Sequence, residues 1–327
     1  MKPILKDKYG RVIDYLRISI TDHCNLRCLY CVTDEIAWVP HEEILRFEEI
    51  TKIVDIFAKE GIRKIRITGG EPLMRKGLPD FISQLSRIEE LDDLSVTTNG
   101  VLLKSQAEAL KKAGLKRINV SLDTLKPERY KIITGRDFFS QVWEGIEMAK
   151  AVGLSPVKIN VVAMKEYNAD EILDLVKLTL EEPYVIRFIE YMPMNESWDD
   201  HNFLSVDDIK AVIESVHALV PIDGTHNNGP ARVFQIPGAR GEIGLISPLS
   251  NHFCGTCNRL RLTADGHLRP CLFSDTEIDI KTPLRSGAND AELRDVLYKT
   301  LALKPKRHHM QSVSAPKCHR GMWSIGG

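Results

Sequence analysis

The chain has 327 residues, of which 43% are hydrophobic and 27% charged, a balance typical of globular proteins that bury a sizeable core. Its formal net charge of −1 gives no global field that would recruit nucleic acid or an acidic membrane, so local cations must meet any anionic ligand. No apolar run has the length of a membrane span, and the charged start MKPILKDKYGRVIDYLR does not fit a signal peptide, which predicts a cytoplasmic protein.

Six short β-like runs alternate with helical patterns between about residue 16 and about residue 190, at the spacing of βα units. The runs are residues 16–20, 64–68, 94–98, 117–122, 157–162 and 185–190. Six such units predict a parallel sheet, either an open doubly wound one or an incomplete barrel. In both architectures the chemistry lies at the carboxyl ends of the strands.

Three of the intervening segments have clear helical signals. Residues 48–61 place apolar side chains at i, i+3, i+4 and i+7, and Gly61 can end that helix. Residues 105–114 and 168–178 each begin with a pair at capping-box spacing. We therefore expect helices at all three segments.

The βα rhythm stops after about residue 195. Residues 201–216 predict one helix, residues 225–248 predict a hairpin, and a further helix is expected from residue 291. The last stretch is basic and weakly patterned. We divide the chain into a barrel domain, residues 1–222, and a C-terminal domain, residues 223–327.

The first cysteine cluster has the spacing C-x3-C-x2-C, formed by Cys24, Cys28 and Cys31 directly after a predicted strand. A structural zinc ion prefers paired C-x2-C elements and four protein ligands, and His23 is awkwardly placed because it adjoins Cys24. A four-iron cubane held by three cysteines keeps one iron available to a small molecule. The spacing therefore favours an iron–sulfur cluster over zinc.

This spacing resembles the signature of the radical S-adenosylmethionine (SAM) superfamily, in which the methionyl amine and carboxylate of SAM chelate the fourth iron. Tyr30, directly before the third cysteine, matches the aromatic of that signature. The strand KIRIT runs into GGEPL, where Gly70 matches the position that binds the SAM amino group. Ser121 and Met192 resemble two further SAM-binding positions of the superfamily, although alone each would be an ordinary strand-end residue.

A second cysteine cluster, Cys254, Cys257 and Cys271, has the spacing C-x2-C-x13-C. Spacing alone favours zinc and iron–sulfur equally, with His252 or His267 as a fourth zinc ligand. Because the chain already has one cluster signature, we expect a second iron–sulfur cluster whose open iron would serve a substrate.

Cations gather around these motifs. Arg259 and Arg261 alternate in NRLRL, so both side chains share one face, and guanidinium groups bind phosphate oxygens with a planar fork. The alternative is a solvated basic edge. Further cations lie in the predicted strands or at their ends and would together make the barrel interior cationic: Arg17, Arg66, Lys158 and Arg187. Each of these alone could be a salt-bridged or snorkelling residue.

The motifs TDHCNLRCLYC, KIRITGGEPL, TTNG, INVSLD, IRFIEYM, CGTCNRLRLTADGHLRPC and the terminal IGG together resemble the GTP 3′,8-cyclase family, which opens molybdenum cofactor biosynthesis. The resemblance extends from residue 17 to residue 327. It implies an α/β fold, an incomplete (βα)6 TIM-like barrel of the radical SAM type with a C-terminal cluster-binding extension. It also implies two 4Fe–4S clusters, SAM as cofactor, and six residues that contact GTP: Arg17, Arg66, Thr97, Lys158, Arg259 and Arg261.

The resemblance further implies the reaction. An electron from the N-terminal cluster cleaves SAM to a 5′-deoxyadenosyl radical, which removes the ribose 3′ hydrogen of GTP, and C3′ then attacks guanine C8. The product is (8S)-3′,8-cyclo-7,8-dihydroguanosine 5′-triphosphate. The C-terminal cluster would bind the guanine. The tail residues Arg320, Gly326 and Gly327 would reach into the active site and act in catalysis.

The implied partners are GTP, an electron donor of the flavodoxin or ferredoxin type, and cyclic pyranopterin monophosphate synthase as the next enzyme. Neither a monomer nor a homodimer is favoured. The segment VTDEIAWVP departs from the family pattern, and Cys318 matches no ligand and is interpreted as a free thiol. Two alternatives stay open: a radical SAM enzyme that modifies a peptide with an auxiliary cluster, and a zinc-stapled binding module without catalysis.

Overall fold

A computed structural model describes residues 3–31, 38–194, 198–222, 229–308, 310 and 320–326. Within these residues, the strands form one sheet in the order β12-β11-β10-β1-β2-β3-β4-β5-β6-β9-β8-β7. The strands are β1 (Tyr15–Ser19), β2 (Lys64–Thr68), β3 (Asp93–Thr98), β4 (Arg117–Ser121), β5 (Val157–Ala163), β6 (Val185–Glu190), β7 (Val220–Pro221), β8 (Arg232–Gln235), β9 (Glu242–Ile246), β10 (Arg259–Leu262), β11 (His267–Arg269) and β12 (Ile278–Asp279).

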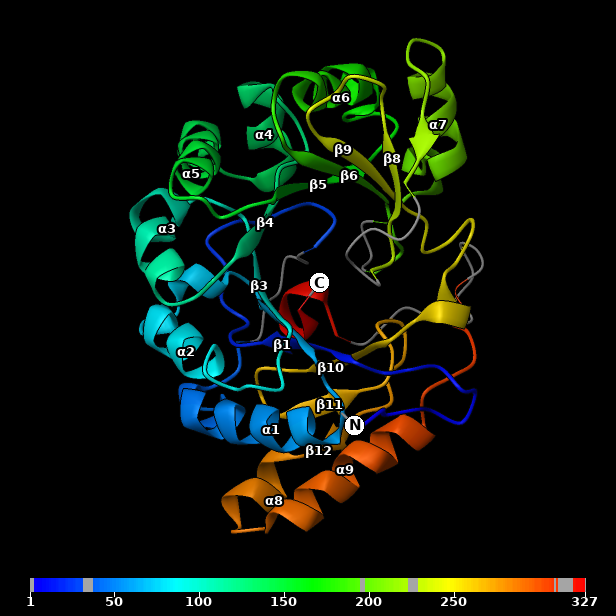
Figure 1. The fold of residues 1–327 in the computed structure, drawn as a ribbon. Helices are drawn as coiled ribbons and strands as arrows, with labels where there is room; N and C mark the ends of the chain where they lie inside the picture. Colours follow the sequence, from blue (N-terminus) through cyan, green and yellow to red (C-terminus); the bar gives the residue numbers. More distant parts are fainter. Residues whose placement is uncertain are drawn as a thin grey trace.

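The centre of this sheet is a curved parallel array. Strands β1 to β6 pair in sequence order, all parallel, and β10 and β9 add parallel strands beside β1 and β6. The described residues contain no pairing between β9 and β10, so the barrel is open on one side (Figure 1). The predicted incomplete barrel with six βα units is therefore confirmed, with a C-terminal strand extending each edge.

Helices cover the outer face of this array (Figure 1). They are α1 (Phe47–Glu60), α2 (Leu78–Leu85), α3 (Leu103–Lys112), α4 (Pro127–Thr134), α5 (Phe139–Ala151), α6 (Ile172–Glu181), α7 (Val206–Glu214), α8 (Lys281–Arg285) and α9 (Asp290–Ala302). Single turns of 3₁₀ helix occur at η1 (His41–Glu43), η2 (Pro72–Met74), η3 (Ala169–Glu171), η4 (Asp200–Asn202) and η5 (Cys254–Thr256). The last helix, α10 (Met322–Ile325), is different because it lies inside the ring of strands, drawn in red in Figure 1.

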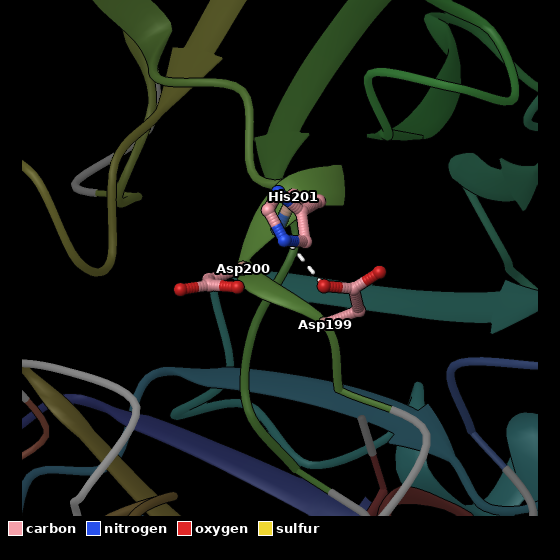
Figure 2. Close-up of side chains that lie close together, drawn as sticks. All are labelled: Asp199, Asp200 and His201. Carbon is pink, nitrogen blue, oxygen red and sulfur yellow. Dashed lines mark hydrogen bonds between the residues drawn. The ribbon is translucent and has the colours of Figure 1, made fainter.

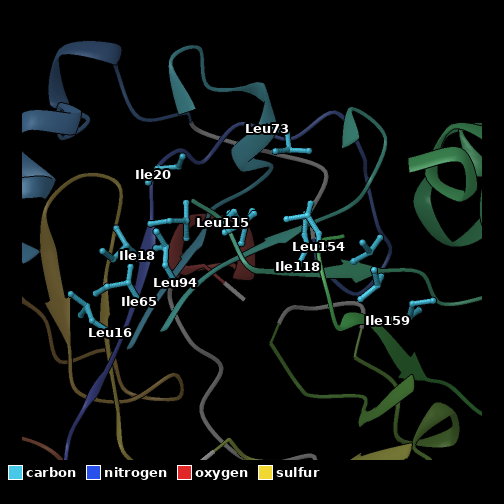
Figure 3. Packing of buried hydrophobic residues seen from close by; sticks show 14 of the residues in the cluster. Leu16, Ile18, Ile20, Ile65, Leu73, Leu94, Leu115, Ile118, Leu154 and Ile159 are labelled. Carbon is cyan, nitrogen blue, oxygen red and sulfur yellow. The ribbon is translucent and has the colours of Figure 1, made fainter. Parts of the chain in front are cut away.

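The hydrophobic core lies between the strands and the outer helices. Leu16, Ile18 and Ile65 point to this side from neighbouring strands, and Ile118 and Ile159 continue the layer (Figure 3). Each is fully buried, and burial of such a side chain contributes about 1.5–3 kcal/mol. The intervening positions carry polar or charged side chains, because successive residues of a strand face opposite sides. The interior of the barrel is therefore polar.

All six strands predicted from the βα rhythm are confirmed, with bounds that differ by no more than one residue. The helix expected at residues 48–61 is α1, and Gly61 ends it at φ 124°, in the region that favours glycine. The predicted hairpin is β8 paired with β9, and the helix expected from residue 291 is α9.

Both predicted capping boxes are wrong. Helix α3 begins at Leu103 without a side-chain cap, and the Ser105 hydroxyl donates to the Leu102 carbonyl at 2.9 Å. Asn168 instead donates to the carbonyls of Asp123 and Val162, each at 2.8 Å. The carboxylate of Glu171 accepts from the Thr124 hydroxyl at 2.6 Å. The side chains of Asn168 and Glu171, which were predicted to cap their own helix, therefore form hydrogen bonds with the loop that follows β4.

Residues 201–216 do not form the single helix that was expected. The segment divides into η4 and α7, and α7 begins behind Ser205, which forms a capping box with Asp208. The predicted domain boundary at residue 222 falls just after β7, within a sheet that continues across it. None of the helices in the described residues is both long enough and apolar enough to span a membrane.

Candidate active site

A cavity of about 280 Å³ lies at the carboxyl ends of the parallel strands. All six cysteines predicted as metal ligands line it, although the two clusters are more than two hundred residues apart in sequence. Every SAM-binding position predicted from the sequence also lines it: Tyr30, Gly70, Ser121 and Met192. The fold thus brings both cysteine clusters and the glycine-rich turn to one space.

The first cysteine cluster is already surrounded by donors. The Cys24 sulfur accepts from the Leu26 backbone N–H at 3.4 Å and from the Asn99 side chain at 3.7 Å. Burial raises the pKa of the Cys24 thiol, and burial with the neighbouring Cys31 raises that of Cys28 further. Burial, followed by Cys24, raises the pKa of Cys31 to about 12. Bound iron offsets this cost because its positive charge stabilises thiolates, so the site fits a cluster.

The GGEP turn supports the loop that carries these cysteines. Gly70 donates its backbone N–H to the Thr21 carbonyl at 2.7 Å, and Glu71 donates to the His23 carbonyl at 2.7 Å. A Cβ atom on Gly70 would lie 2.4 Å from the carbonyl oxygens of Asp22 and His23. The glycine is therefore required by the approach of the cysteine loop itself, in addition to the ligand approach expected from the sequence.

Asp123 is a site residue that sequence reasoning missed. It follows β4 in the motif NVSLD, accepts from the Tyr30 hydroxyl at 2.8 Å and from the Val162 backbone N–H at 2.8 Å. Burial raises the pKa of Asp123 to about 6. Its position two residues after Ser121 was the available signal, because the carboxyl ends of all these strands meet at the cavity. Asp123 fixes the aromatic ring that precedes the third cysteine.

The second cysteine cluster lies beside β10, which pairs with β1 on one side and with β11 on the other. Cys254 begins η5, Cys257 directly follows η5 and precedes β10, and Cys271 follows β11. Burial alone would raise the pKa of Cys257, but Arg259 and Lys304 lower it to about 6. In the described residues, neither cysteine cluster brings its three sulfur atoms all within 4.8 Å of one another.

The predicted GTP-binding residues separate into two sets. Arg17, Thr97, Arg259 and Arg261 line the cavity, whereas Arg66 and Lys158 are buried in the barrel interior outside the lining. Arg17 pairs in register with Arg66 on one side and with Arg261 on the other. Burial and then Arg261 and Arg66 hold the pKa of Arg17 well below its usual value.

Several arginine and lysine side chains therefore lie close together in the barrel interior. Burial, followed by Arg259, lowers the pKa of Arg261 to about 9. Burial, followed by Arg187, lowers that of Lys158 to about 7. Such a cluster is stabilised by an anion that binds between the cations. Two buried cavity-lining atoms, the Thr97 hydroxyl oxygen and the Asn160 side-chain oxygen, have no hydrogen-bond partner within the described part of the chain.

The C-terminal tail enters the same space. The backbone N–H of Trp323 donates to the Cys31 sulfur, and Arg261 donates to the carbonyls of Ile325 and Gly326. Gly326 has φ 70°, and a Cβ there would lie 2.4 Å from the Thr68 methyl group. Of the described tail residues, Met322 lines the cavity, and Arg320 and Gly326 do not. Gly327 and Cys318 lie outside the described residues.

Arg320 binds at the edge of the sheet and does not line the cavity. Its two terminal nitrogens pair with the Asp265 carboxylate at 3.0 and 2.8 Å, and its Nε pairs with Glu277 at 2.9 Å. Asp265 lies in the turn between β10 and β11, where His267 also pairs with it at 3.3 Å. These contacts give Arg320 an anchoring role for the tail.

Another group of potential metal ligands lies apart from the cavity, at Asp199, Asp200 and His201 (Figure 2). The Asp199 carboxylate accepts from the His201 backbone N–H at 3.0 Å and caps η4. Asp200 and His201 are exposed. Three consecutive residues at a helix cap explain this proximity, and we assign no metal to them.

Comparison with known proteins agrees with this geometry. The Radical SAM superfamily matches residues 18–179, and the family Molybdenum Cofactor Synthesis C matches residues 184–310. A protein of Thermodesulfovibrio yellowstonii named GTP 3′,8-cyclase is 52% identical over 327 residues, covering 99% of this chain and 100% of that protein. One of Moorella thermoacetica with the same name is 49% identical over 325 residues, covering 99% and 100%.

Solved structures show the same fold at low sequence identity. Streptococcus suis SuiB bound to S-adenosylmethionine matches with a TM-score of 0.63 and 16% identity, covering 90% of this chain and 69% of SuiB. Native anSMEcpe with bound AdoMet matches with a TM-score of 0.60 and 20% identity, covering 91% and 82%. With the cavity, the cysteine clusters and the full-length relatives, these findings show that the chain belongs to the GTP 3′,8-cyclase family of radical SAM enzymes.

Proposed function

We propose that the chain converts GTP to (8S)-3′,8-cyclo-7,8-dihydroguanosine 5′-triphosphate, the first step of molybdenum cofactor biosynthesis. The observation that carries this proposal is one cavity lined by two cysteine clusters and three arginines. A cluster for SAM at one end and cations for a triphosphate at the other match the two halves of the reaction. The names of the full-length relatives supply the substrate.

The N-terminal cysteines Cys24, Cys28 and Cys31 would hold the 4Fe–4S cluster that the radical SAM family uses with SAM. When bound, the cluster and SAM supply the one-electron chemistry that abstracts a substrate hydrogen. The protein's part is positional: Gly70, Ser121 and Met192 line the space beside the cluster for the methionyl and adenine parts of SAM. Tyr30 is held by Asp123 at 2.8 Å, which fixes the wall of that space.

A second 4Fe–4S cluster on Cys254, Cys257 and Cys271 is part of the proposal. Two observations support it: the three cysteines line the same cavity, and Arg259 and Lys304 outweigh the effect of burial and lower the pKa of Cys257 to about 6. An iron without a fourth protein ligand there would bind the guanine base.

The triphosphate is assigned to the cations that line the cavity. Arg17, Arg259 and Arg261 present guanidinium groups from adjacent strands, and Thr97 presents an unpartnered hydroxyl within the described residues. Arg66 and Lys158 contribute positive potential from the buried positions behind them. These groups hold C3′ and C8 of GTP in place and exclude water, and none of them needs to transfer a proton.

The tail completes the site in this proposal. Gly326 lies against Thr68 at the end of β2, and Arg261 contacts both the tail and the proposed triphosphate site. Arg320 anchors this insertion, and Gly327 is proposed to extend it. We further propose a flavodoxin- or ferredoxin-type electron donor, cyclic pyranopterin monophosphate synthase as the enzyme that takes the product onward, and action in the cytoplasm.

The test is anaerobic turnover of the reconstituted full chain with SAM, a reductant and GTP. We expect 5′-deoxyadenosine and the cyclised nucleotide to form together and both to require GTP. Formation of 5′-deoxyadenosine at the same rate without GTP would contradict the proposal. Protein with bound zinc and no iron would contradict radical chemistry altogether.

Two cysteine variants test separately the two proposed functions of the site, SAM cleavage and GTP cyclisation. Each variant serves as the control for the other. Cys24→Ser should abolish SAM cleavage, because it removes a ligand of the SAM-binding cluster. Cys257→Ser should keep some SAM cleavage but lose the cyclised product. Identical behaviour of the two variants would show that the division of labour is wrong.

A further inference from the structure

Lys304 is a fully buried lysine at the second cysteine cluster, and the reaction outlined above gives it no role. It follows the end of α9 and is 2% exposed. Its ammonium donates to the Arg259 carbonyl at 2.7 Å, to the Pro270 carbonyl at 2.8 Å and to the Cys257 sulfur at 3.6 Å. An ammonium has three donors, so these three acceptors use all of them.

These acceptors belong to the two segments that carry the second cysteine cluster. Arg259 lies two residues after Cys257, and Pro270 directly precedes Cys271. One side chain from a third element therefore joins both ligand-bearing segments. Its buried position also gives the charge little screening by solvent, so the ammonium acts strongly on the adjacent sulfur.

A second cation contacts the same cluster in a different way. Arg11 donates to the Cys254 carbonyl at 2.8 Å and to the Pro305 carbonyl at 2.8 Å. It thus fastens the backbone of the first ligand and the segment that follows Lys304. Its hydrogen bonds go to backbone carbonyls and to Asp7, whereas Lys304 reaches a ligand sulfur.

We infer that Lys304 is a positioning residue for the second iron–sulfur cluster, joining its two ligand segments and raising its reduction potential through the charge beside Cys257. This inference rests on the proposed second cluster. Hydrogen bonds to cluster sulfurs and nearby positive charge favour the more negative, reduced state. The neutral variant Lys304→Met has nearly the same volume and lacks both the charge and the donors.

The experiment measures iron content and midpoint potentials of the anaerobically reconstituted full chain, by an electron paramagnetic resonance redox titration. Wild-type protein should contain about eight irons in two reducible clusters. In Lys304→Met, one midpoint should move to a more negative value by about 59 mV, a tenfold change in a one-electron equilibrium, while the other stays unchanged. Lys299→Met is the matched control, because Lys299 is an exposed lysine on α9, the helix that precedes Lys304, and should shift neither midpoint.

Lys304→Arg keeps the charge and covers the case in which Lys304→Met fails to assemble the cluster. Loss of about half the iron in Lys304→Met with retention in Lys304→Arg would support the inference. Equal loss in both variants, or two clusters with unchanged midpoints in Lys304→Met, would overturn it. Wild-type protein with about four irons would instead refute the second cluster and hence the proposed function.

Discussion

Arg17 connects the two halves of the proposed site. It lies on the first barrel strand, lines the cavity, and is paired in register with Arg66 and Arg261. Burial and then the charges of Arg261 and Arg66 hold the pKa of Arg17 well below its usual value. Closely spaced positive charges of this kind favour the binding of an anion between them.

We predict that Arg17→Ala weakens GTP binding to the cluster-loaded chain by about 10- to 100-fold. A charged hydrogen bond contributes about 1.5–3 kcal/mol, and each 1.4 kcal/mol is a tenfold change in affinity. Lys158→Met, at a buried position outside the cavity lining, should weaken binding less. Equilibrium GTP binding measured by calorimetry tests this order, and a larger loss for Lys158→Met would contradict it.

His267 gives a second prediction, on pH. The Asp265 carboxylate, 3.3 Å from the His267 ring, raises the pKa of His267 above the usual 6.5. Because the folded pKa is raised, the stabilisation is fully present below about pH 6.5 and is lost as pH rises through the folded value. The free energy of unfolding of iron-free protein should therefore exceed that of His267→Gln at pH 5.5, and the difference should shrink by pH 8.5. Urea unfolding at both values tests this, and a gap that widens with pH would contradict it.

The site residues differed in how well they could be predicted from the sequence. The cysteines could be predicted because metal ligands recur at short spacing, and the strand-end residues because parallel strands end at a common edge. Lys304 could not, because its partner Cys257 lies 47 residues away and no local pattern marks a buried lysine. Asp265 was missed for the same reason, since Arg320 lies 55 residues from it.

Tertiary contacts at both ends of helix α10 hold this short helix in its position. A four-residue helix has little intrinsic stability in water. Arg320 precedes it and binds Asp265 and Glu277, while Arg261 holds the carbonyls that follow. The element is therefore ordered by tertiary hydrogen bonds.

We predict that Asp265→Asn loosens the tail. Losing a paired carboxylate removes charged hydrogen bonds of about 1.5–3 kcal/mol, so amide exchange at residues 320–326 should rise about tenfold or more. Hydrogen–deuterium exchange with mass spectrometry at constant pH measures this. Asp295→Asn, an exposed position on α9, serves as the control. Unchanged exchange of the tail in Asp265→Asn would show that Arg320 is not the anchor.

Sequence patterns located the strands and longer helices better than their ends. The βα rhythm predicted a parallel sheet but left an open doubly wound sheet and an incomplete barrel both possible. The caps at residues 105 and 168 were wrong because Asn168 and Glu171 are used in contacts with the loop after β4, which a local pattern cannot reveal. The alternation of Arg259 and Arg261 predicted that their side chains share one face, but the pairing of β10 with β1 depends on the whole topology.

The strands in the described part of the chain form a single sheet, which continues across the domain boundary predicted at residue 222. Strands β9 and β10 come from the C-terminal part and cover the outer edges of β6 and β1. A fragment of residues 1–222 would expose both edges, together with the apolar layer beneath α9. Exposed parallel edges of this kind favour association between chains.

We therefore predict that the fragment 1–222 aggregates under conditions in which the full chain remains monodisperse. Size-exclusion chromatography with light scattering, run on both proteins in parallel, tests this. A monodisperse fragment with a single cooperative unfolding transition would show that the barrel is an independent domain after all.

The pairing of β1 with β10 also bears on how the protein is made. Asn258, at the start of β10, donates to Asp14 at 2.6 Å across 244 positions of sequence. During translation, the first strand emerges from the ribosome long before its edge partner exists. Such long-range pairing is slow, and the exposed edge needs protection until the ribosome has finished most of the chain. The cavity lined by both cysteine clusters is therefore complete only late in synthesis, after these two distant parts of the chain have met.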